Sequence, residues 1–326
     1  MMLKIVIVCC WVLACWSSAV SEAASDLTAS ESRRSVVHNL KTSLPYLPES
    51  RVVGGQPAPI EKYPYAVQVT TYNVVTCGGT LVSTKHVLTA AHCGFQHGSL
   101  VEMDVVYLRM GSVIPLKGGT TYDCAQFVKH PMYNAPLRDS DIGLFVTKSE
   151  VTLGPAVSIA LVAPREYDVA DNAKVTYIGW GYLGNGLPQA ESLQEVPVFV
   201  VPWDQCRRRY GELERVTNRS FPVTRNMFCA GLLDVGGKDA CGGDSGGPVI
   251  EGGVVVGVIS WGLLCADRAF PGVNIKVSRY YDWIDDTLDK LPGIMLASVG
   301  TKLRSGAVLT LCTVVFCFYF LSANKH

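Results

Sequence analysis

From Val52 onward, hydrophobic residues gather in short β-branched runs that glycine, proline and asparagine interrupt. The clearest of these runs cover residues 65–72, 78–83, 175–181, 196–201 and 249–261. Many short strands with turn residues between them are typical of a β-sandwich or a β-barrel. The pattern therefore predicts an all-β domain.

One stretch near the end of this region has a helical pattern. Between Ser278 and Lys290, the apolar residues Tyr281, Ile284 and Leu288 recur at the spacing of one helix face. Ser278 is a residue type that caps helix N-termini. We therefore expect a closing helix over 278–290.

The N-terminal 51 residues differ from this domain. An apolar run over 5–16 follows Lys4 and is followed by small residues. It is shorter than the roughly 20 residues of a membrane-spanning helix, and it predicts a secretory signal peptide over 1–24. Residues 25–51 are polar without a sustained period, as expected of a disordered or detachable segment.

A second apolar run, over 307–321, lies in the C-terminal tail of residues 292–326. Small residues at 298–300 and a polar spacer at 301–306 precede it, which is the order of a glycolipid-anchor signal. A short transmembrane helix and an unprocessed hydrophobic extension are the alternatives. We favour the lipid anchor, and either anchor places the protein on the outer cell surface.

Composition adds two constraints. The chain has 326 residues, of which 28 are basic and 28 acidic, so no overall charge attracts nucleic acid. Export to an oxidising compartment makes disulfides the expected state of its cysteines. Of the 12 cysteines, the seven outside the two terminal apolar runs are Cys77, Cys93, Cys124, Cys206, Cys229, Cys241 and Cys265. An odd number leaves at least one without a partner.

Three short motifs carry candidate chemistry. They are "LTAAHCG" around His92, "DSDIGL" around Asp141 and "GGDSGGP" around Ser245. Each alone has a plainer structural interpretation, such as a turn or a cap. A nucleophilic serine, however, needs a base to take its proton and an acid to orient that base. The chain supplies one of each.

With these motifs, with "RVVGG" at Arg51 and with "SWG" at 260–262, the sequence resembles the chymotrypsin family of serine proteases, and trypsin-like members in particular. The resemblance runs from Arg51 to about Lys290. It implies two packed six-stranded antiparallel β-barrels with a C-terminal helix, as a protease domain over residues 52–291.

The resemblance also assigns catalytic roles. Ser245 would be the nucleophile, His92 the general base and then acid, and Asp141 the group that orients His92. The backbone N–H groups of Gly243 and Ser245 would form the oxyanion hole. Neither a metal nor another cofactor is needed for this chemistry, and the residues after Met110 lack the glutamates that bind calcium in trypsin.

The segment around Arg51 resembles an activation site. Cleavage after Arg51 would release residues 25–51 as a propeptide and free the α-amine of Val52. In this family that amine pairs with the aspartate beside the serine, which is Asp244 here, and the pairing forms the oxyanion hole. The full-length chain is therefore expected to be a zymogen.

The expected specificity pocket has an acidic floor. Asp239 matches the position that binds the substrate's Arg or Lys in trypsin-like members. Gly262 and Gly272 match small residues of the pocket wall, and Ser260, Trp261 and Gly262 would pair with the substrate backbone as an added strand.

Two residues depart from the trypsin pattern in this pocket. Ala240 replaces a serine whose hydroxyl would help to bind an ammonium group, whereas a guanidinium meets Asp239 through two parallel bonds. We therefore predict a preference for Arg over Lys. Asn274 stands where tyrosine is usual, and this departure affects how strong the preference for Arg over Lys is.

By the same resemblance, three disulfides are expected: Cys77–Cys93, Cys206–Cys229 and Cys241–Cys265. Another bridge common in the family is absent, because Val175 and Glu251 occupy its positions. Cys124 is left over, and we favour a buried, inert thiol over an intermolecular bridge. The sequence "NRS" at Asn218 is a sequon for N-glycosylation on an expected surface loop.

Together these features predict a secreted or cell-surface serine endopeptidase. Its expected partners are polypeptides with Arg or Lys at the cleaved bond, an activating protease or a second copy of itself, and protein protease inhibitors. The main alternative is a catalytically inactive protease fold that serves as a binding scaffold. Such a scaffold usually lacks the histidine or the serine, and this chain has both.

Overall fold

The computed structural model describes residues 53–135 and 137–291. The expectations for the signal peptide, the propeptide and the tail concern residues outside these ranges. None of the helices within the two ranges has the length and apolar character that a membrane crossing needs.

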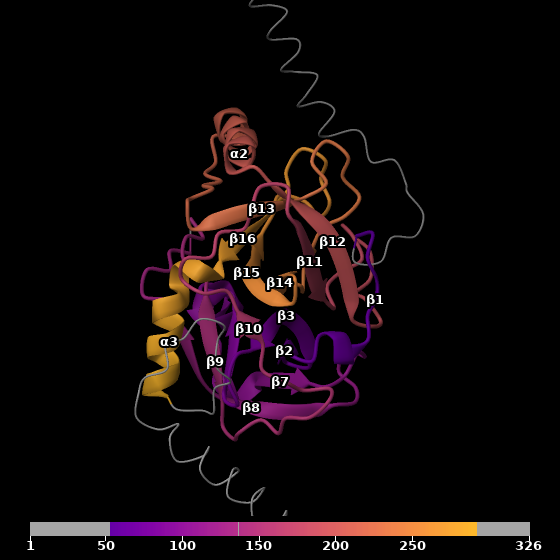
Figure 1. Ribbon diagram of the computed structural model, residues 1–326, viewed down its shortest axis with the longest axis vertical. Coiled ribbons are helices and arrows are strands. Elements are labelled where there is room, and N and C mark those ends of the chain that lie inside the picture. Colours follow the sequence, from indigo (N-terminus) through magenta and orange to yellow (C-terminus); the bar gives the residue numbers. More distant parts are fainter. Residues whose placement is uncertain (1–52, 136, 292–326) are drawn as a thin grey trace, which may run out of the picture. The chain divides into compact units, whose positions relative to one another are not determined.

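The first half of the domain forms a closed six-stranded antiparallel barrel (Figure 1). Its strands, in order around the barrel, are β2 (Ala66–Thr71), β3 (Val74–Leu81), β4 (His86–Thr89), β9 (Gly143–Thr147), β8 (Thr120–Lys129) and β7 (Val106–Met110). The β7 strand alternates between buried and half-buried residues, with Val106, Leu108 and Met110 pointing into the core. A two-residue turn joins β2 to β3, and both of its residues, Tyr72 and Asn73, have positive φ, as the twist of a hairpin favours.

The second half forms another closed six-stranded ring. Its strands, in order, are β12 (Gln194–Val201), β11 (Lys174–Gly179), β14 (Pro248–Glu251), β15 (Val254–Trp261), β16 (Gly272–Lys276) and β13 (Met227–Gly231), and β13 pairs with β12 to close it. The short β1 (Gln56–Pro57) is added antiparallel to β12, and β10 (Leu161–Val162) is added parallel to β15. The two closed antiparallel barrels confirm the predicted fold class.

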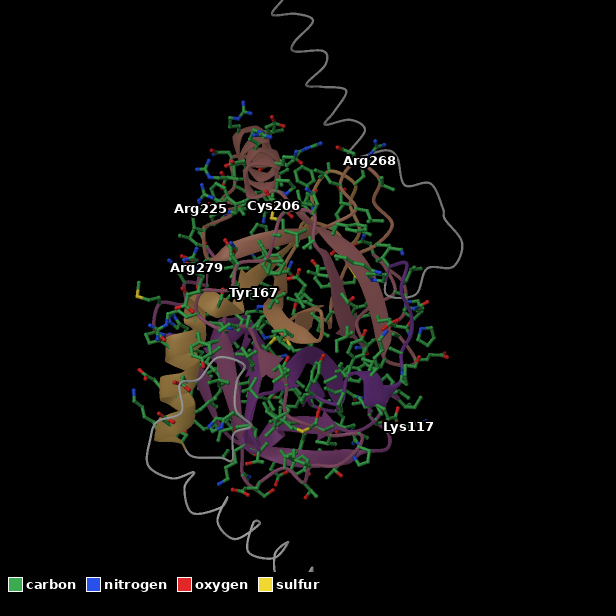
Figure 2. The ribbon with its side chains drawn as sticks, viewed as in Figure 1. Lys117, Tyr167, Cys206, Arg225, Arg268 and Arg279 are labelled. Carbon is green, nitrogen blue, oxygen red and sulfur yellow. A yellow bond between two sulfur atoms is a disulfide. The ribbon has the colours of Figure 1, made fainter. Side chains whose placement is uncertain are left out.

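Smaller elements connect and cover the barrels. They are η1 (Ile60–Lys62), η2 (Ala91–Gly94), β5 (Phe95–Gln96), β6 (Ser99–Leu100), η3 (Met103–Val105), α2 (Trp203–Thr217), η4 (Val277–Tyr280) and α3 (Tyr281–Lys290). The α2 helix was not predicted. It buries Cys206, Tyr210 and Leu213 along one face, and Figure 2 shows Cys206 on the side of α2 that faces the barrel.

The predicted closing helix is present as α3, but its start was predicted wrongly. The chain enters α3 through the 3-10 turn η4, so Ser278 lies buried inside that turn and does not cap the helix. Ile284 and Leu288 are buried as expected. The Tyr280 hydroxyl, at the junction, donates to Ser140 Oγ of the first half at 3.1 Å. This bond therefore links the turn that leads into α3 to the first half of the domain.

The three expected disulfides are present: Cys77–Cys93, Cys206–Cys229 and Cys241–Cys265. Cys124 is a free, fully buried thiol whose sulfur lies 3.5 Å from the sulfur of Met103. Burial raises the pKa of this thiol to about 11. The predicted burial of Cys124 is confirmed, and its lack of reactivity stays a prediction that this burial supports.

Candidate active site

The two barrels meet at the predicted catalytic residues. The Gly78 N–H of β3 donates to the carbonyl of Ser245 at 2.8 Å, and Gly246 N–H donates to Ile259 of β15 at 2.7 Å. The loop that carries Ser245, between β13 and β14, is therefore fixed to both barrels by backbone hydrogen bonds.

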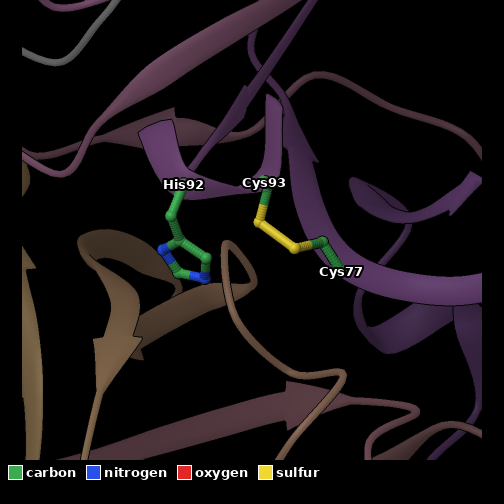
Figure 3. A group of neighbouring side chains, drawn as sticks. All are labelled: Cys77, His92 and Cys93. Carbon is green, nitrogen blue, oxygen red and sulfur yellow. A yellow bond between two sulfur atoms is a disulfide. The ribbon is translucent and has the colours of Figure 1, made fainter. Parts of the chain in front are cut away.

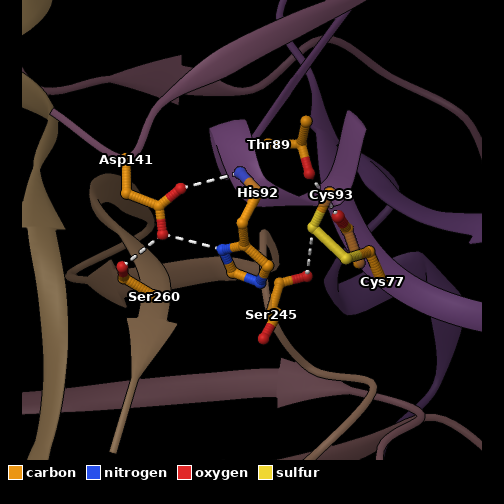
Figure 4. Close-up of polar contacts among 8 residues, drawn as sticks. Cys77, Thr89, His92, Cys93, Asp141, Ser245 and Ser260 are labelled. Carbon is orange, nitrogen blue, oxygen red and sulfur yellow. Dashed lines mark hydrogen bonds and ion pairs between the residues drawn. A yellow bond between two sulfur atoms is a disulfide. The ribbon is translucent and has the colours of Figure 1, made fainter. Parts of the chain in front are cut away.

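A histidine–aspartate pair lies next to this loop (Figure 4). Asp141 Oδ2 is 2.7 Å from His92 Nδ1, and Asp141 Oδ1 accepts a hydrogen bond from the backbone N–H of His92 at 2.8 Å. Asp141 is fully buried, whereas the His92 side chain is 25% exposed. Figure 4 shows the other side of the imidazole ring turned toward Ser245. The three residues predicted to form the triad are therefore brought together.

Ser260 adds a contact to this pair that the sequence did not predict. Its hydroxyl donates to Asp141 Oδ2 at 2.6 Å. Burial alone raises the pKa of Asp141, but the charge of His92 and the hydrogen bonds from His92 and Ser260 hold it below its ordinary value. An ionised Asp141 favours the His92 tautomer with a proton on Nδ1, which leaves Nε2 free to accept one.

The disulfide Cys77–Cys93 lies directly beside His92 (Figure 3). These three side chains are close enough to resemble a metal site, but the two sulfurs are bonded to each other. A disulfide offers no thiolate to a metal ion. The bridge instead links η2, which carries His92, to β3.

The backbone before Ser245 turns sharply. Gly243 has φ +91°, and a methyl group added there would lie 3.1 Å from the Cα of Gly181. Within the described ranges, the N–H groups of Gly243 and Ser245 donate to no other backbone carbonyl. The two N–H groups therefore have no backbone acceptor in this part of the chain, and their role in an oxyanion hole stays a prediction.

Asp244 points away from the cleft into the protein. It is 1% exposed, and its two carboxylate oxygens accept from the N–H groups of Gly181 at 2.7 Å and Cys241 at 2.9 Å. Burial raises the pKa of Asp244 to about 6 despite these bonds. Its predicted partners in activation, Arg51 and Val52, lie outside the described residues.

A cavity of about 220 Å³ opens next to Ser245. Ser245 and all six predicted substrate-binding residues line it: Asp239, Ala240, Ser260, Trp261, Gly262 and Gly272. Asn274, which the sequence analysis placed in this pocket, lines it too, and so do Tyr177, Asn185 and Arg138, which were not predicted.

Asp239 is the buried acidic group of this cavity. It is 3% exposed, and its carboxylate accepts from the N–H groups of Ala240 at 2.8 Å and Ala266 at 3.2 Å. Burial raises the pKa of Asp239 to about 8, against the effect of these two bonds, with further contributions from Asp244 and Asp267. No cationic side chain forms an ion pair with Asp239 in the described part of the chain. A cation that entered the cavity would supply one.

Two closed antiparallel barrels, with a histidine–aspartate pair of the first beside a serine of the second, define a chymotrypsin-like serine protease. The family model for trypsin matches residues 52–284, and the chain belongs to the trypsin family of serine proteases. It is a trypsin-like serine endopeptidase.

Individual relatives agree with this assignment. The chain is 42% identical to Trypsin, alkaline C of Manduca sexta, over 72% of this chain and 90% of the relative. It is 37% identical to Trypsin CFT-1 of Choristoneura fumiferana, over 74% of this chain and 93% of the relative. It is 36% identical to Trypsin-4 of Rattus norvegicus, over 76% of this chain and 93% of the relative.

Proposed function

We propose that the chain is the zymogen of an endopeptidase that cleaves peptide bonds after arginine. The observation that carries this proposal is that Ser245 and the buried carboxylate of Asp239 line the same cavity. A cationic side chain bound at Asp239 would bring the following peptide bond to the Ser245 hydroxyl.

The proposed reaction proceeds through an acyl-enzyme. Ser245 Oγ attacks the carbonyl carbon while its proton passes to His92 Nε2. The oxyanion is bound by the N–H groups of Gly243 and Ser245. The C–N bond then breaks, and the amine leaves with the proton from His92. Water then hydrolyses the acyl-enzyme by the same steps. It gives a proton to His92 and attacks the ester carbonyl, and the acid product leaves as His92 returns the proton to Ser245 Oγ.

Asp141 contributes to this reaction through position and charge. It holds the Nδ1 side of His92, and its negative charge stabilises the imidazolium that forms when His92 takes the proton. The bond from Ser260 keeps the second lone pair of Asp141 Oδ2 satisfied in a buried place.

Activation is proposed to follow cleavage after Arg51. The amine of Val52 would then pair with Asp244, which otherwise has only N–H partners. In support, the next residue, Val53, already packs beside the pocket, where its carbonyl accepts from Asp239 N–H at 3.3 Å. Because the proposed preference matches Arg51, a second copy of the enzyme or another trypsin-like protease would serve as activator.

The preference for Arg over Lys is proposed from Ala240. Its methyl group offers no hydroxyl to an ammonium, whereas a guanidinium supplies two parallel donors to Asp239. Ala240→Ser is expected to raise cleavage after Lys relative to Arg.

The processing of the chain and its cellular location are also proposals. Residues 1–24 would direct export, residues 25–51 would leave on activation, and the 292–326 tail would anchor the protease at the cell surface. Asn218 is exposed at the end of α2, where a glycan would meet solvent. Polypeptides and protein protease inhibitors are the proposed partners.

A serine-directed fluorophosphonate probe tests the catalytic assignment. After cleavage at Arg51, verified by N-terminal sequencing, the probe is expected to label Ser245 in mass spectra, and His92→Ala is expected to abolish labelling. The uncut protein should react far more slowly. Labelling at another residue, or none in the cut protein, would contradict the assignment and favour the inactive scaffold. Equal labelling before and after the cut would contradict the zymogen.

A further inference from the structure

Arg138 brings a positive charge to the catalytic cavity. Among the described residues that line this cavity, only Asp239 and Arg138 have charged side chains. The two differ in burial, because Asp239 is 3% exposed whereas Arg138 is exposed to solvent. The proposed function uses the buried carboxylate, but it gives no role to the accessible guanidinium.

The two charges come from different halves of the domain. Arg138 lies in the loop between β8 and β9, in the stretch that leads to Asp141. Within the described ranges it is the only cavity-lining residue of the first half, since all the others lie at Tyr177 or later in the chain. An occupant of the cavity that binds Asp239 therefore has Arg138 on its first-barrel side.

The backbone of Arg138 is held in a tight loop. Its N–H donates to the carbonyl of Asn134 at 2.7 Å, and the Asn134 N–H donates to the carbonyl of Asp139 at 3.2 Å. Asp139 also ties the loop to the second half of the domain, because its Oδ1 accepts from Thr224 Oγ1 at 3.0 Å and from Asn226 Nδ2 at 3.3 Å. The loop therefore holds the backbone of Arg138 in place while the side chain stays accessible.

The guanidinium of Arg138 is free to bind a ligand. No ion pair between described residues includes it. Asp139, its neighbour in the chain, directs Oδ1 to Thr224, to Asn226 and to the backbone N–H of Ser140. A positive charge beside a binding cavity, with no acid paired to it in this part of the chain, favours a negative group on the ligand.

The electrostatics of Tyr133 place Arg138 on the His92 side of the cavity. Burial and the charge of Asp141 raise the pKa of Tyr133 to about 12, and the charge of Arg138 opposes this rise. Both charges therefore act on the same hydroxyl. The Tyr133 ring lies against that of Phe95, with 6.0 Å between their centres, and Phe95 directly follows η2, which carries His92.

An extended substrate would present alternate side chains to these two sides. Successive side chains of a strand point in opposite directions. If the substrate arginine points to Asp239, the residue immediately before it points to the opposite side, where His92 and Arg138 lie. A carboxylate at that substrate residue would meet the guanidinium of Arg138.

We propose that Arg138 is a specificity residue that selects an acidic side chain at the substrate residue immediately before the arginine. A carboxylate matches the fork of a guanidinium through two parallel hydrogen bonds. A basic residue at the same substrate position would be repelled. Glu–Arg and Asp–Arg sequences are therefore preferred, and dibasic sequences are disfavoured. This inference rests on the proposed function and deepens it, because it adds a second substrate residue to the recognition of arginine.

The test compares kcat/KM on four fluorogenic peptides with Arg at the cleaved bond. In three of them the residue before Arg is Glu, Gln or Lys. In the fourth, Gln precedes Arg and Glu stands one position further away. We expect the wild type to prefer Glu over Gln by about two- to fivefold, as an exposed ion pair implies, and to cleave the Lys peptide less well than the Gln peptide. The fourth peptide should gain less than Glu next to Arg. High salt should weaken the preference, because it screens exposed charges.

Three variants assign the effect to Arg138. Arg138→Gln should abolish the preference for Glu over Gln, Arg138→Lys should keep part of it, and Arg138→Glu should reverse it so that the Lys peptide becomes the better substrate. Lys117→Gln is the control, because it removes an exposed cation between β7 and β8 that does not line the cavity. It should leave the preference as in the wild type. A purely structural role for Arg138 would change all peptides alike and would not follow the sign of the charge.

Active enzyme is counted with the fluorophosphonate probe, so misfolded protein does not enter kcat. A wild type without the preference, or a preference that Arg138→Gln leaves unchanged, would overturn the inference while leaving the protease and its cleavage after Arg intact. A larger gain from Glu in the fourth peptide would overturn the alternation on which the substrate position rests. If the wild type cleaves none of the four peptides, the proposed function itself fails and the inference fails with it. If Arg138→Glu does not fold, Arg138→Gln and the salt dependence decide the outcome.

Discussion

The raised pKa of Asp239 predicts that cations bind the specificity cavity in a strongly pH-dependent way. Burial shifts this pKa from 3.8 to about 8, so the carboxyl is largely protonated and neutral at pH 6 in the free enzyme. A cation such as benzamidine binds only the ionised form well. Binding therefore has to expel a proton below pH 8, and affinity must rise with pH up to that value.

The magnitude follows from the ionised fraction. With a pKa of about 8, that fraction is about 1% at pH 6, about 10% at pH 7 and about 50% at pH 8. The affinity for benzamidine is therefore expected to rise roughly 50-fold from pH 6 to pH 8, and only about twofold above it.

Isothermal titration calorimetry in buffers of different ionisation enthalpy measures both quantities. We expect about one proton to be released per benzamidine at pH 6, in the His92→Ala variant as in the wild type, because Asp239 is the group that titrates. Asp239→Asn should lose most of the affinity and all of the pH dependence. A wild-type affinity that is flat between pH 6 and pH 8 would refute the assigned pKa. A pH dependence that vanishes in His92→Ala would place the titration at the histidine instead.

Three further predictions concern stability and catalysis. Burial lowers the pKa of His86 from 6.5 to about 4, so the free energy of unfolding should fall by about 3 kcal/mol as the pH drops from 6.5 toward 4. In urea unfolding, His86→Gln should flatten this loss of stability at acid pH. An unchanged pH dependence in the variant would contradict the assignment to His86. Glu195 accepts from Gln56, Lys62 and Tyr63 at 2.8, 2.5 and 2.5 Å, so Glu195→Gln should cost about 1–3 kcal/mol of unfolding free energy at pH 7, whereas a loss under 0.5 kcal/mol would mean that the cluster is not coupled to folding. Ser260→Ala removes a hydrogen-bond donor from the buried carboxylate of Asp141. We therefore expect kcat to fall about tenfold with a small change in KM, and the acid limb of the pH–rate profile to move to higher pH. An unmoved profile would exclude an effect through Asp141.

Much of the site could be predicted because the family motifs are short and local. His92, Asp141 and Ser245 each lie in a recognisable stretch, and all six predicted pocket residues line the cavity. The β-branched runs predicted an all-β domain, and the resemblance to the chymotrypsin family is what implied two barrels.

The contacts that were missed join residues far apart in the chain. Asn274 and Tyr177 are 97 residues apart and meet only because their barrel closes. The bond from Ser260 to Asp141 spans 119 residues and both barrels. No local pattern encodes such a contact, so the departure at Asn274 was visible in the sequence but its partner was not.

The α2 helix was missed for a different reason. Cys206, Tyr210 and Leu213 follow a helical spacing, and this signal was available in the sequence. The three arginines at 207–209 and the acidic residues around them make the segment mostly polar, so only one narrow apolar stripe remains. Ser278 shows the reverse error, because a good capping residue type was taken for a cap while the chain continued through a 3-10 turn.

The measurement that tests the central claim most directly is the cleavage of matched Arg, Lys and Leu peptides before and after a verified cut at Arg51, with Ser245→Ala as control. We predict activity only after the cut, highest on the Arg peptide, much lower on Lys, and absent in Ser245→Ala. Turnover of the Leu peptide alone would contradict the assignment of Asp239 as the specificity residue. A verified cut with no turnover of any peptide would contradict the proposed protease activity itself.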